Sequence, residues 1–169
     1  DVQGVLTEAL VAGADGEERG LGPEELAMSY RETALKHSPP GRPDVVLAAT
    51  FRLEPADSDT IAERLADIRR WRQEHQPIGQ KSAGSVFRNP DGDSAGRIID
   101  ELGLKEHRVG GAMISPVHAN FIVNTGDASA ADVRALAELA RETVRRERGL
   151  DLAYEVEFVG HWDDAEEGT

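Results

Sequence analysis

The sequence predicts an α+β fold, and three observations lead to this expectation. Two segments, near residues 60–75 and 130–148, repeat apolar residues every three to four positions, as amphipathic helices do. Several short apolar runs lie between turn residues such as glycine, proline and aspartate, which is typical of strands joined by hairpins. Because helices and hairpin-linked strands are mixed, the pattern favours α+β over a doubly wound parallel sheet.

The first 55 residues are expected to be mostly strands joined by turns. Residues 5–12 alternate loosely between apolar and polar side chains, and Asp15 with Gly16 is a hairpin turn signal. The expected elements are a strand at 5–12, its return at 19–21, a helical turn at 22–26, a loop at 38–43 and a strand at 44–53.

A helix is expected to link this part to the rest of the chain. Residues 54–58 are the best candidate for a domain boundary. Thr60 with Glu63 forms a capping-box pattern, and the helix is expected to end near His75, before Pro77. The linking helix therefore covers 56–76, between a first part at 1–55 and a domain at 77–160.

The rest of the chain is expected to combine two helices with three strands. Ser129 with Asp132 caps a long amphipathic helix that Gly149 can end. The expected elements are a short helix at 95–102 ended by Gly103, strands at 110–114 and 119–124, the long helix, a last strand at 154–159 and an acidic tail at 161–169.

Composition and charge exclude several classes of function. The 169-residue chain has a formal net charge of −13, which argues against nucleic acid because phosphate backbones need a basic surface. Its apolar runs are far shorter than a membrane span, so no membrane partner is expected. With no cysteine and five scattered histidines, neither a thiol nucleophile nor a metal site is expected.

One stretch, residues 82–90 (Ser-Ala-Gly-Ser-Val-Phe-Arg-Asn-Pro), carries most of the candidate chemistry. Gly84 lets the backbone approach a ligand and leaves the Ser85 hydroxyl unscreened, while Arg88 and Asn89 add hydrogen-bond donors. On spacing alone, a turn that enters a strand is the favoured interpretation. No nucleophile elbow, phosphate loop or dinucleotide glycine fingerprint accompanies the stretch.

Two further residues each have a functional and an ordinary interpretation. Arg31 follows Tyr30 before a loop, where its guanidinium either clamps a carboxylate or stacks on Tyr30 at the surface. Glu155 alternates with Val156 and faces away from the core, either into a cleft or into water. The residues alone therefore indicate a soluble α+β domain with an anion-binding cleft around Ser85.

The order of these motifs resembles the UDP-N-acetylenolpyruvoylglucosamine reductase (MurB) family, the flavoenzymes of peptidoglycan precursor synthesis. The short connection between Thr33 and Asp44 is similar to the shorter of the family's two types. The matching segments are Tyr30-Arg31, Gln76-Pro77, residues 82–90, 95–99, 103–105 and 108–112, Ser115, residues 118–124 and Glu155-Val156.

This resemblance implies an oxidoreductase that depends on FAD and NADPH. NADPH would reduce FAD, and the hydride would then pass to the enolpyruvyl ether of UDP-N-acetylglucosamine to give UDP-N-acetylmuramate. The resemblance implies that Ser85 donates the proton, and that Arg31 and Glu155 act on the substrate carboxylate. It also implies substrate contacts for Tyr30, Arg72, Gly84 and Asn89.

The resemblance also sets expectations for organisation. Residues 1–55 resemble the C-terminal part of an FAD-binding domain, and 77–160 resemble an α+β substrate-binding domain with a mainly antiparallel sheet. Because the family's glycine-rich flavin loops lie upstream of Asp1, the chain is expected to be a fragment that binds FAD poorly and is inactive alone. A cytoplasmic monomer that serves cell-wall synthesis, cell shape and cell division is implied.

Two alternatives to the reductase stay open. One is a flavin-free domain that only captures a UDP-sugar, which a native start near Asp1 would favour over an upstream flavin domain. The other is a relative in the wider flavin-oxidase group with a different substrate. Such a relative is expected to lack the combination of Arg31, Ser85 and Glu155.

Overall fold

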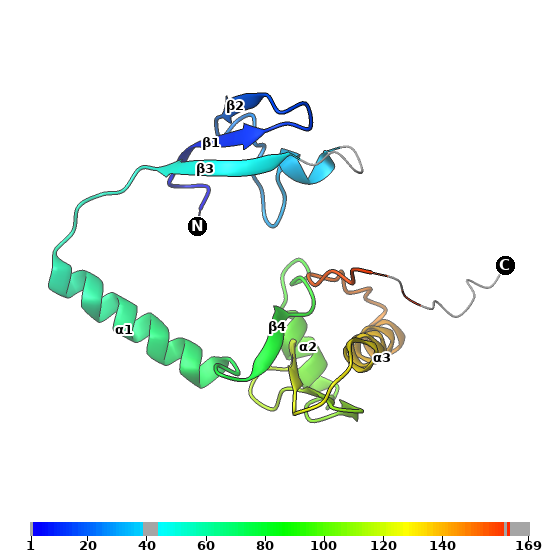
Figure 1. Cartoon of the computed structure of the whole chain (residues 1–169). Helices are drawn as coiled ribbons and strands as arrows, with labels where there is room; N and C mark the ends of the chain where they lie inside the picture. Colours follow the sequence, from blue (N-terminus) through cyan, green and yellow to red (C-terminus); the bar gives the residue numbers. More distant parts are fainter. Residues whose placement is uncertain (1, 39–43, 161, 163–169) are drawn as a thin grey trace. The chain divides into compact units, whose positions relative to one another are not determined.

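A computed structural model describes residues 2–38, 44–160 and 162 of the chain. The chain divides into two compact units, Asp1–Ile61 and Ala62–Thr169 (Figure 1). The division falls inside the expected linking helix.

The first unit is a three-stranded antiparallel sheet in the order β2-β1-β3. It comprises β1 (Leu6–Ala12), β2 (Glu18–Leu21) and β3 (Val45–Phe51). The predicted hairpin is confirmed, with Gly16 in its turn at φ 83°. A short 3₁₀ helix, η1 (Ala34–His37), was not predicted, and of the predicted loop at 38–43 only Ser38 lies among the described residues. The small core consists of Leu6, Ala9, Val11 and Leu26.

Helix α1 (Ser58–His75) ends where the sequence predicts and begins two residues inside the expected 56–76 segment, ahead of the expected cap at Thr60. The expected Thr60–Glu63 capping box does not start it. Instead, the carboxylate of Asp57 accepts hydrogen bonds from the backbone N–H groups of Asp59 and Thr60, at 3.1 and 3.0 Å. The hydrogen bonds from Thr60 hold the pKa of Asp57 below its usual range. Asp57 is therefore the residue that accepts hydrogen bonds from the backbone N–H groups of the first helical turn.

The second unit is built on a four-stranded antiparallel sheet in the order β4-β7-β6-β5. Its strands are β4 (Lys81–Ser85), β5 (Arg108–Val109), β6 (Ala112–Ile114) and β7 (Phe121–Asn124). The two predicted strands correspond to β6 and β7, while the two-residue β5 was not predicted. The expectation of a mainly antiparallel sheet is confirmed.

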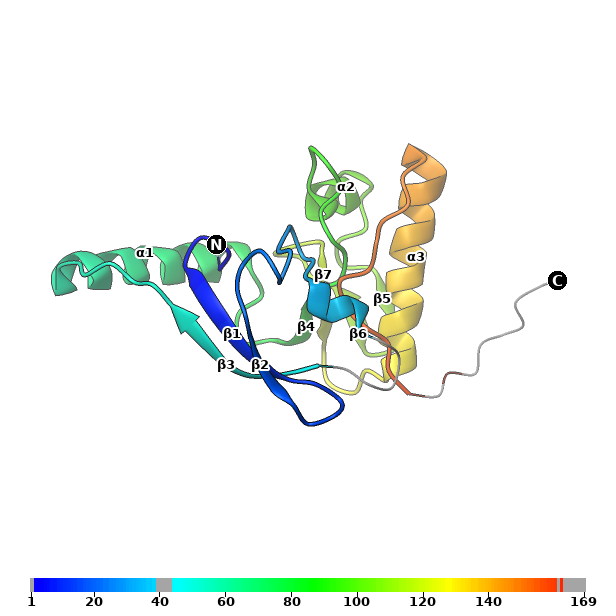
Figure 2. The same ribbon diagram turned by 90° about the horizontal axis from the view of Figure 1, so that it is seen from above.

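Two helices accompany this sheet, α2 (Ala95–Glu101) and α3 (Ala130–Arg148). The predicted caps of α3 are confirmed, since Ser129 and Asp132 form a capping box and Gly149 ends the helix at φ 65°. Helix α3 runs along one side of the sheet (Figures 1 and 2) and contacts β5, β6 and β7. The core between them is apolar and includes Phe87, Ile99, Ile114, Leu136 and Val144.

Residues 150–160, called here the C-terminal strap, return beside α3 without forming the predicted strand (Figure 2). The expected strand at 154–159 is wrong, because the strap forms no regular ladder and its β-pairing, among the described residues, is an isolated bridge between Tyr154 and Phe87. Ring contacts and an ion pair between Arg141 and Asp151 also hold the strap. Tyr154 lies 5.2 Å from Phe87 and 5.4 Å from Phe158 between ring centroids, and the guanidinium of Arg141 lies 5.2 Å from the Tyr154 ring.

Membrane-spanning helices and metal clusters are both absent from the part of the chain that the structure describes. Among residues 2–38, 44–160 and 162, no helix is long and apolar enough to cross a membrane. The same residues contain no cluster of three or more His, Asp or Glu side chains able to hold a metal ion. The predicted acidic tail, apart from Trp162, lies outside the described residues.

Candidate functional site

A β-bulge places Ser85 at the end of β4. Ser82 pairs with Val123 and Ser85 pairs with Phe121, so Ala83 and Gly84 together lie opposite the single residue between those two partners. Gly84 takes a left-handed conformation at φ 89°. Because side chains alternate along a strand with a period of two, the extra residue changes which face Ser85 presents. The serine is half-buried there.

The requirement for glycine at the bulge is conformational and not steric. A Cβ atom built on Gly84 would have no other heavy atom within 4 Å, yet an L-residue at this φ is strained. Gly79 provides a matched comparison, because its φ is 85° and its Cβ would also meet nothing within 4 Å. Gly79 lies in the Pro77–Gln80 turn before the strand begins.

We therefore expect Gly84→Ala and Gly79→Ala to lower the free energy of unfolding by similar amounts, about 1–2 kcal/mol each. Only Gly84→Ala is expected to disturb the Ser85 hydroxyl, and hence to slow a reaction in which that hydroxyl takes part about 10- to 100-fold. Urea denaturation measures the first effect, and steady-state kinetics of the longest native form of the protein measure the second. Equal activity in the two variants would show that the bulge does not position Ser85.

The C-terminal strap brings Glu155 next to the Ser85 segment. The backbone N–H of Glu155 donates to the carbonyl of Val86 at 2.8 Å, and the N–H of Arg88 donates to the carbonyl of Ala153 at 2.9 Å. The Glu155 side chain is half-buried. Two predicted catalytic residues, separated by 70 positions in the sequence, are thus joined through one intervening residue, Val86.

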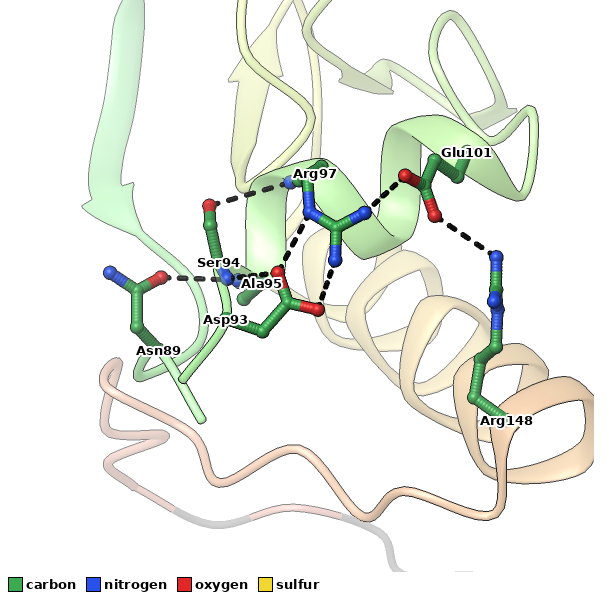
Figure 3. A network of polar contacts seen from close by, with 7 residues as sticks. All are labelled: Asn89, Asp93, Ser94, Ala95, Arg97, Glu101 and Arg148. Carbon is green, nitrogen blue, oxygen red and sulfur yellow. Dashed lines mark hydrogen bonds and ion pairs between the residues drawn. The ribbon is translucent and has the colours of Figure 1, made fainter. Parts of the chain in front are cut away.

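Asn89 is held by the start of helix α2 (Figure 3). Its side-chain oxygen accepts a hydrogen bond from the backbone N–H of Ala95 at 3.1 Å. This contact takes up the amide oxygen and turns the Nδ2 donor away from the helix (Figure 3). The Nδ2 group of Asn89 is therefore oriented to donate to an acceptor, such as a phosphate or carbonyl oxygen of a ligand.

Charged side chains brace the loop that carries Asn89 (Figure 3). Arg97 forms ion pairs with Asp93 and Glu101 on either side of it, and Glu101 also accepts from Arg148 of α3 at 3.0 Å. Hydrogen bonding to Arg97, followed by that from Ser94, holds the pKa of Asp93 below its usual range. The network ties the loop to helices α2 and α3.

Arg31 and Tyr30 belong to the first unit, in a tight turn. Ser29 and Glu32 exchange backbone hydrogen bonds at 3.0 and 3.2 Å across it, and Arg31 has φ 59°. Left-handed backbone favours glycine, so an arginine at this position is unusual. Its carbonyl accepts from the Lys36 ammonium at 2.5 Å. The turn lines an open pocket of about 600 Å³.

Arg72 lies on the last turn of α1, where its Nε donates to the side-chain oxygen of Gln76 at 3.2 Å. The residue is exposed. Of the predicted site residues, the structure brings together Gly84, Ser85, Asn89 and Glu155. Arg31 and Tyr30 lie in the other unit.

Sequence reasoning missed the contribution of Asn120. This residue lies in a segment that matches the family pattern, yet no contact was expected of it. It is 3% exposed and bonds to the backbone of Phe87. A polar residue directly before the apolar run of β7 was the available signal, because a buried amide needs partners.

The described residues do not fit the pyrophosphate of FAD at a helix N-terminus. A helix binds phosphate through free N–H groups in its first turn, usually after a glycine-rich loop. Here side chains of the protein already occupy such groups in α1, α2 and α3, and within the described chain no loop with two glycines leads into these helices. The occupying side chains are those of Asp57, Asn89, Ser94 and Ser129.

Comparisons with known proteins identify a family. The family model for the UDP-N-acetylenolpyruvoylglucosamine reductase C-terminal domain matches residues 76–159. A reductase of this name from Bacillus licheniformis is 41% identical over 160 residues, which cover 95% of this chain and 85% of that protein. One from Chloroflexus aggregans is 47% identical over 161 residues, covering 94% of this chain and 54% of that protein.

A solved structure shows the same fold. The crystal structure of the UDP-N-acetylenolpyruvylglucosamine reductase (MurB) from Thermus caldophilus superposes with a TM-score of 0.73 at 41% identity. The match covers 90% of this chain and 53% of that one. The chain spans about half the length of most of these relatives.

Proposed function

The chain belongs to the UDP-N-acetylenolpyruvoylglucosamine reductase family, and on this premise we propose that its second unit binds and protonates the enolpyruvyl ether of UDP-N-acetylglucosamine. The observation that carries the proposal is the placement of Ser85 at a bulge and beside the strap that holds Glu155. FAD and NADPH are the proposed cofactors of the whole protein and supply the hydride. Proton transfer at Ser85 is a separate step.

Ser85 is the proposed proton donor. A serine hydroxyl is a poor acid in water, but it can donate to a strongly basic carbon held within hydrogen-bond distance. Such a carbon arises beside a carboxylate when a hydride adds to the neighbouring carbon of a double bond. A half-buried position supports this role, because the hydroxyl then competes less with water as the donor.

Arg31 and Glu155 are the proposed partners of the substrate carboxylate. Negative charge grows on that carboxylate as the double bond is reduced, and a fixed guanidinium stabilises it best in a site that excludes water. An arginine binds both carboxylate oxygens at once, which also fixes the orientation of the substrate. A left-handed backbone at Arg31 supports a role for its side chain, since glycine would suit the turn better.

Four residues are proposed to contact the UDP-sugar. Asn89 supports this assignment most directly, because its Nδ2 donor is turned outward by the bond to Ala95. Gly84 would let the ligand approach the backbone, while Tyr30 and Arg72 are exposed and able to meet it. A cytoplasmic role in peptidoglycan precursor synthesis, as a monomer without nucleic-acid or membrane partners, completes the proposal.

Binding measurements on the 169-residue chain test this function. We expect UDP-N-acetylglucosamine enolpyruvate to bind and to shift the backbone amide signals of Gly84, Ser85 and Asn89 in NMR spectra. We expect the chain to stay colourless after incubation with FAD and gel filtration, because the helix N-termini of its described residues do not fit a pyrophosphate. A yellow preparation would refute the flavin expectation, and unchanged amide signals would refute substrate binding.

The flavin-free UDP-sugar binder is the second candidate. It predicts substrate binding without turnover in the longest native form of the protein. Oxidation of NADPH that depends on the enolpyruvyl substrate in that form would exclude it.

A further inference from the structure

Asn120 forms a buried clamp on the backbone next to Ser85. Its side-chain oxygen accepts from the N–H of Phe87 at 2.9 Å, and its Nδ2 donates to the carbonyl of Phe87 at 2.8 Å. Its own carbonyl accepts from the N–H of Val86 at 2.8 Å. One buried residue thus binds three backbone groups of the segment that begins directly after Ser85.

The contacts of Asn120 continue the connection between β4 and β7 beyond the point where the two strands stop pairing. Strand β4 ends at Ser85 and β7 begins at Phe121, so the segments that meet beyond them lack a regular ladder. The carboxamide of Asn120 presents one donor and one acceptor in the spacing of a peptide group, and it satisfies both polar groups of Phe87. On the other side, the carbonyl of Val86 accepts from Glu155.

A second layer of contacts holds Asn120. Its backbone N–H donates to Nδ1 of His118 at 3.2 Å, which requires that nitrogen to be unprotonated. Burial, and then the charge of Lys105, lowers the pKa of His118 and favours this form. Gly96 of α2 leaves space for the ring, because a Cβ atom there would lie 2.6 Å from its Cε1.

We propose that Asn120 is a positioning residue: its carboxamide, bonded to both polar groups of Phe87, fixes Ser85 and the strap of Glu155 in their reactive arrangement. This inference rests on the proposed function. Asn120 itself would touch neither substrate nor cofactor. Its removal should therefore lower the rate of substrate protonation and leave substrate affinity and NADPH oxidation largely unchanged.

The variant Asn120→Asp tests the clamp through pH. An ionised carboxylate can still accept from the Phe87 N–H but repels the Phe87 carbonyl, whereas the protonated acid can donate to it as the amide does. Burial raises the pKa of such a carboxyl by up to about 3–5 units, into the neutral range. We expect kcat for substrate reduction to fall about 100-fold near pH 8. The ratio of the variant's kcat to the kcat of the unsubstituted protein should rise about tenfold between pH 8 and pH 6.

Asn124, at the end of strand β7, provides the matched control. Its side-chain oxygen accepts from the N–H groups of Gly126 and Ala128, at 2.8 and 3.2 Å. A carboxylate can accept both bonds equally well, so Asn124→Asp should keep the unsubstituted kcat at each pH. His118→Ala is a second variant for the case that Asn120→Asp does not fold, since it removes the acceptor of the Asn120 N–H and the ring contact to Phe121 but leaves the carboxamide of Asn120 intact. We expect it to lower kcat about 3- to 10-fold without changing the NADPH half-reaction.

NMR titration of the 169-residue chain separates this inference from the proposed function. In Asn120→Asp, the amide signals of Ser85, Val86 and Phe87 should follow one titration curve without any ligand. These signals can follow one curve while the unsubstituted holoenzyme does not reduce the substrate. That result would support the positioning role of Asn120 and refute the proposed function. If Ser85 does not respond, or if kcat of Asn120→Asp and of His118→Ala equals that of the unsubstituted protein, the positioning role is overturned.

Discussion

Replacing Ser85 by alanine is expected to slow reduction of the enolpyruvyl substrate about 100- to 10,000-fold, the range that a positioned general acid contributes. Oxidation of NADPH in the absence of substrate should keep its rate, because the hydroxyl has no role in that half-reaction. Substrate affinity should change little, since alanine keeps the backbone of the bulge. Stopped-flow measurement of each half-reaction in the flavin-loaded protein gives the two rates separately.

Ser82 supplies the control for this prediction. It lies on the same strand, before the bulge, and pairs with Val123 in the regular part of the ladder. Ser82→Ala removes an identical hydroxyl from an exposed position and should leave both half-reactions unchanged. A Ser85→Ala protein that loses both half-reactions equally would contradict the proton-donor role and indicate general damage.

Elements governed by neighbouring residues could be predicted from the sequence. The capping box of Ser129 with Asp132 and the glycine stop at Gly149 both depend on contacts within one or two helical turns. The helix start at Asp57 was missed because two polar residues close together each could cap it, and only the geometry decides between them. Local competition of this kind shifts a boundary without changing the element.

Features that depend on distant partners could not be predicted from local pattern. The alternation of residues 154–159 is that of a strand, but a strand forms only where a neighbour offers free backbone groups. Here the strap bonds to the backbone of Val86 and Arg88 at separate places, and contacts to Phe87 and Arg141 hold it elsewhere. The bulge at Gly84 likewise follows from its register against β7. Family resemblance predicted roles for Ser85 and Glu155, and the hydrogen bond from Glu155 to Val86 explains why their segments lie side by side.

Arg31→Gly is expected to separate the stability of the first unit from its function. At φ 59° an arginine carries a backbone strain of about 1–2 kcal/mol that glycine does not, so the variant should unfold at the same or a higher urea concentration. Removing a guanidinium that stabilises developing charge should lower kcat for substrate reduction about 100- to 1,000-fold. Arg31→Lys should keep the strain and the charge but lose the two-point grip on the carboxylate, and should therefore recover only part of the rate.

Ala27 makes this test specific to the arginine side chain. It is a second non-glycine residue of the first unit with positive φ, at 44°, and its side chain is exposed. Ala27→Gly should relieve similar strain while activity stays unchanged. If Arg31→Gly gains stability and also keeps the unsubstituted rate, the turn holds an arginine for a reason other than substrate reduction. If it loses the rate while Ala27→Gly does not, the strained turn is explained by the side chain it presents, because selection for stability alone would favour glycine there.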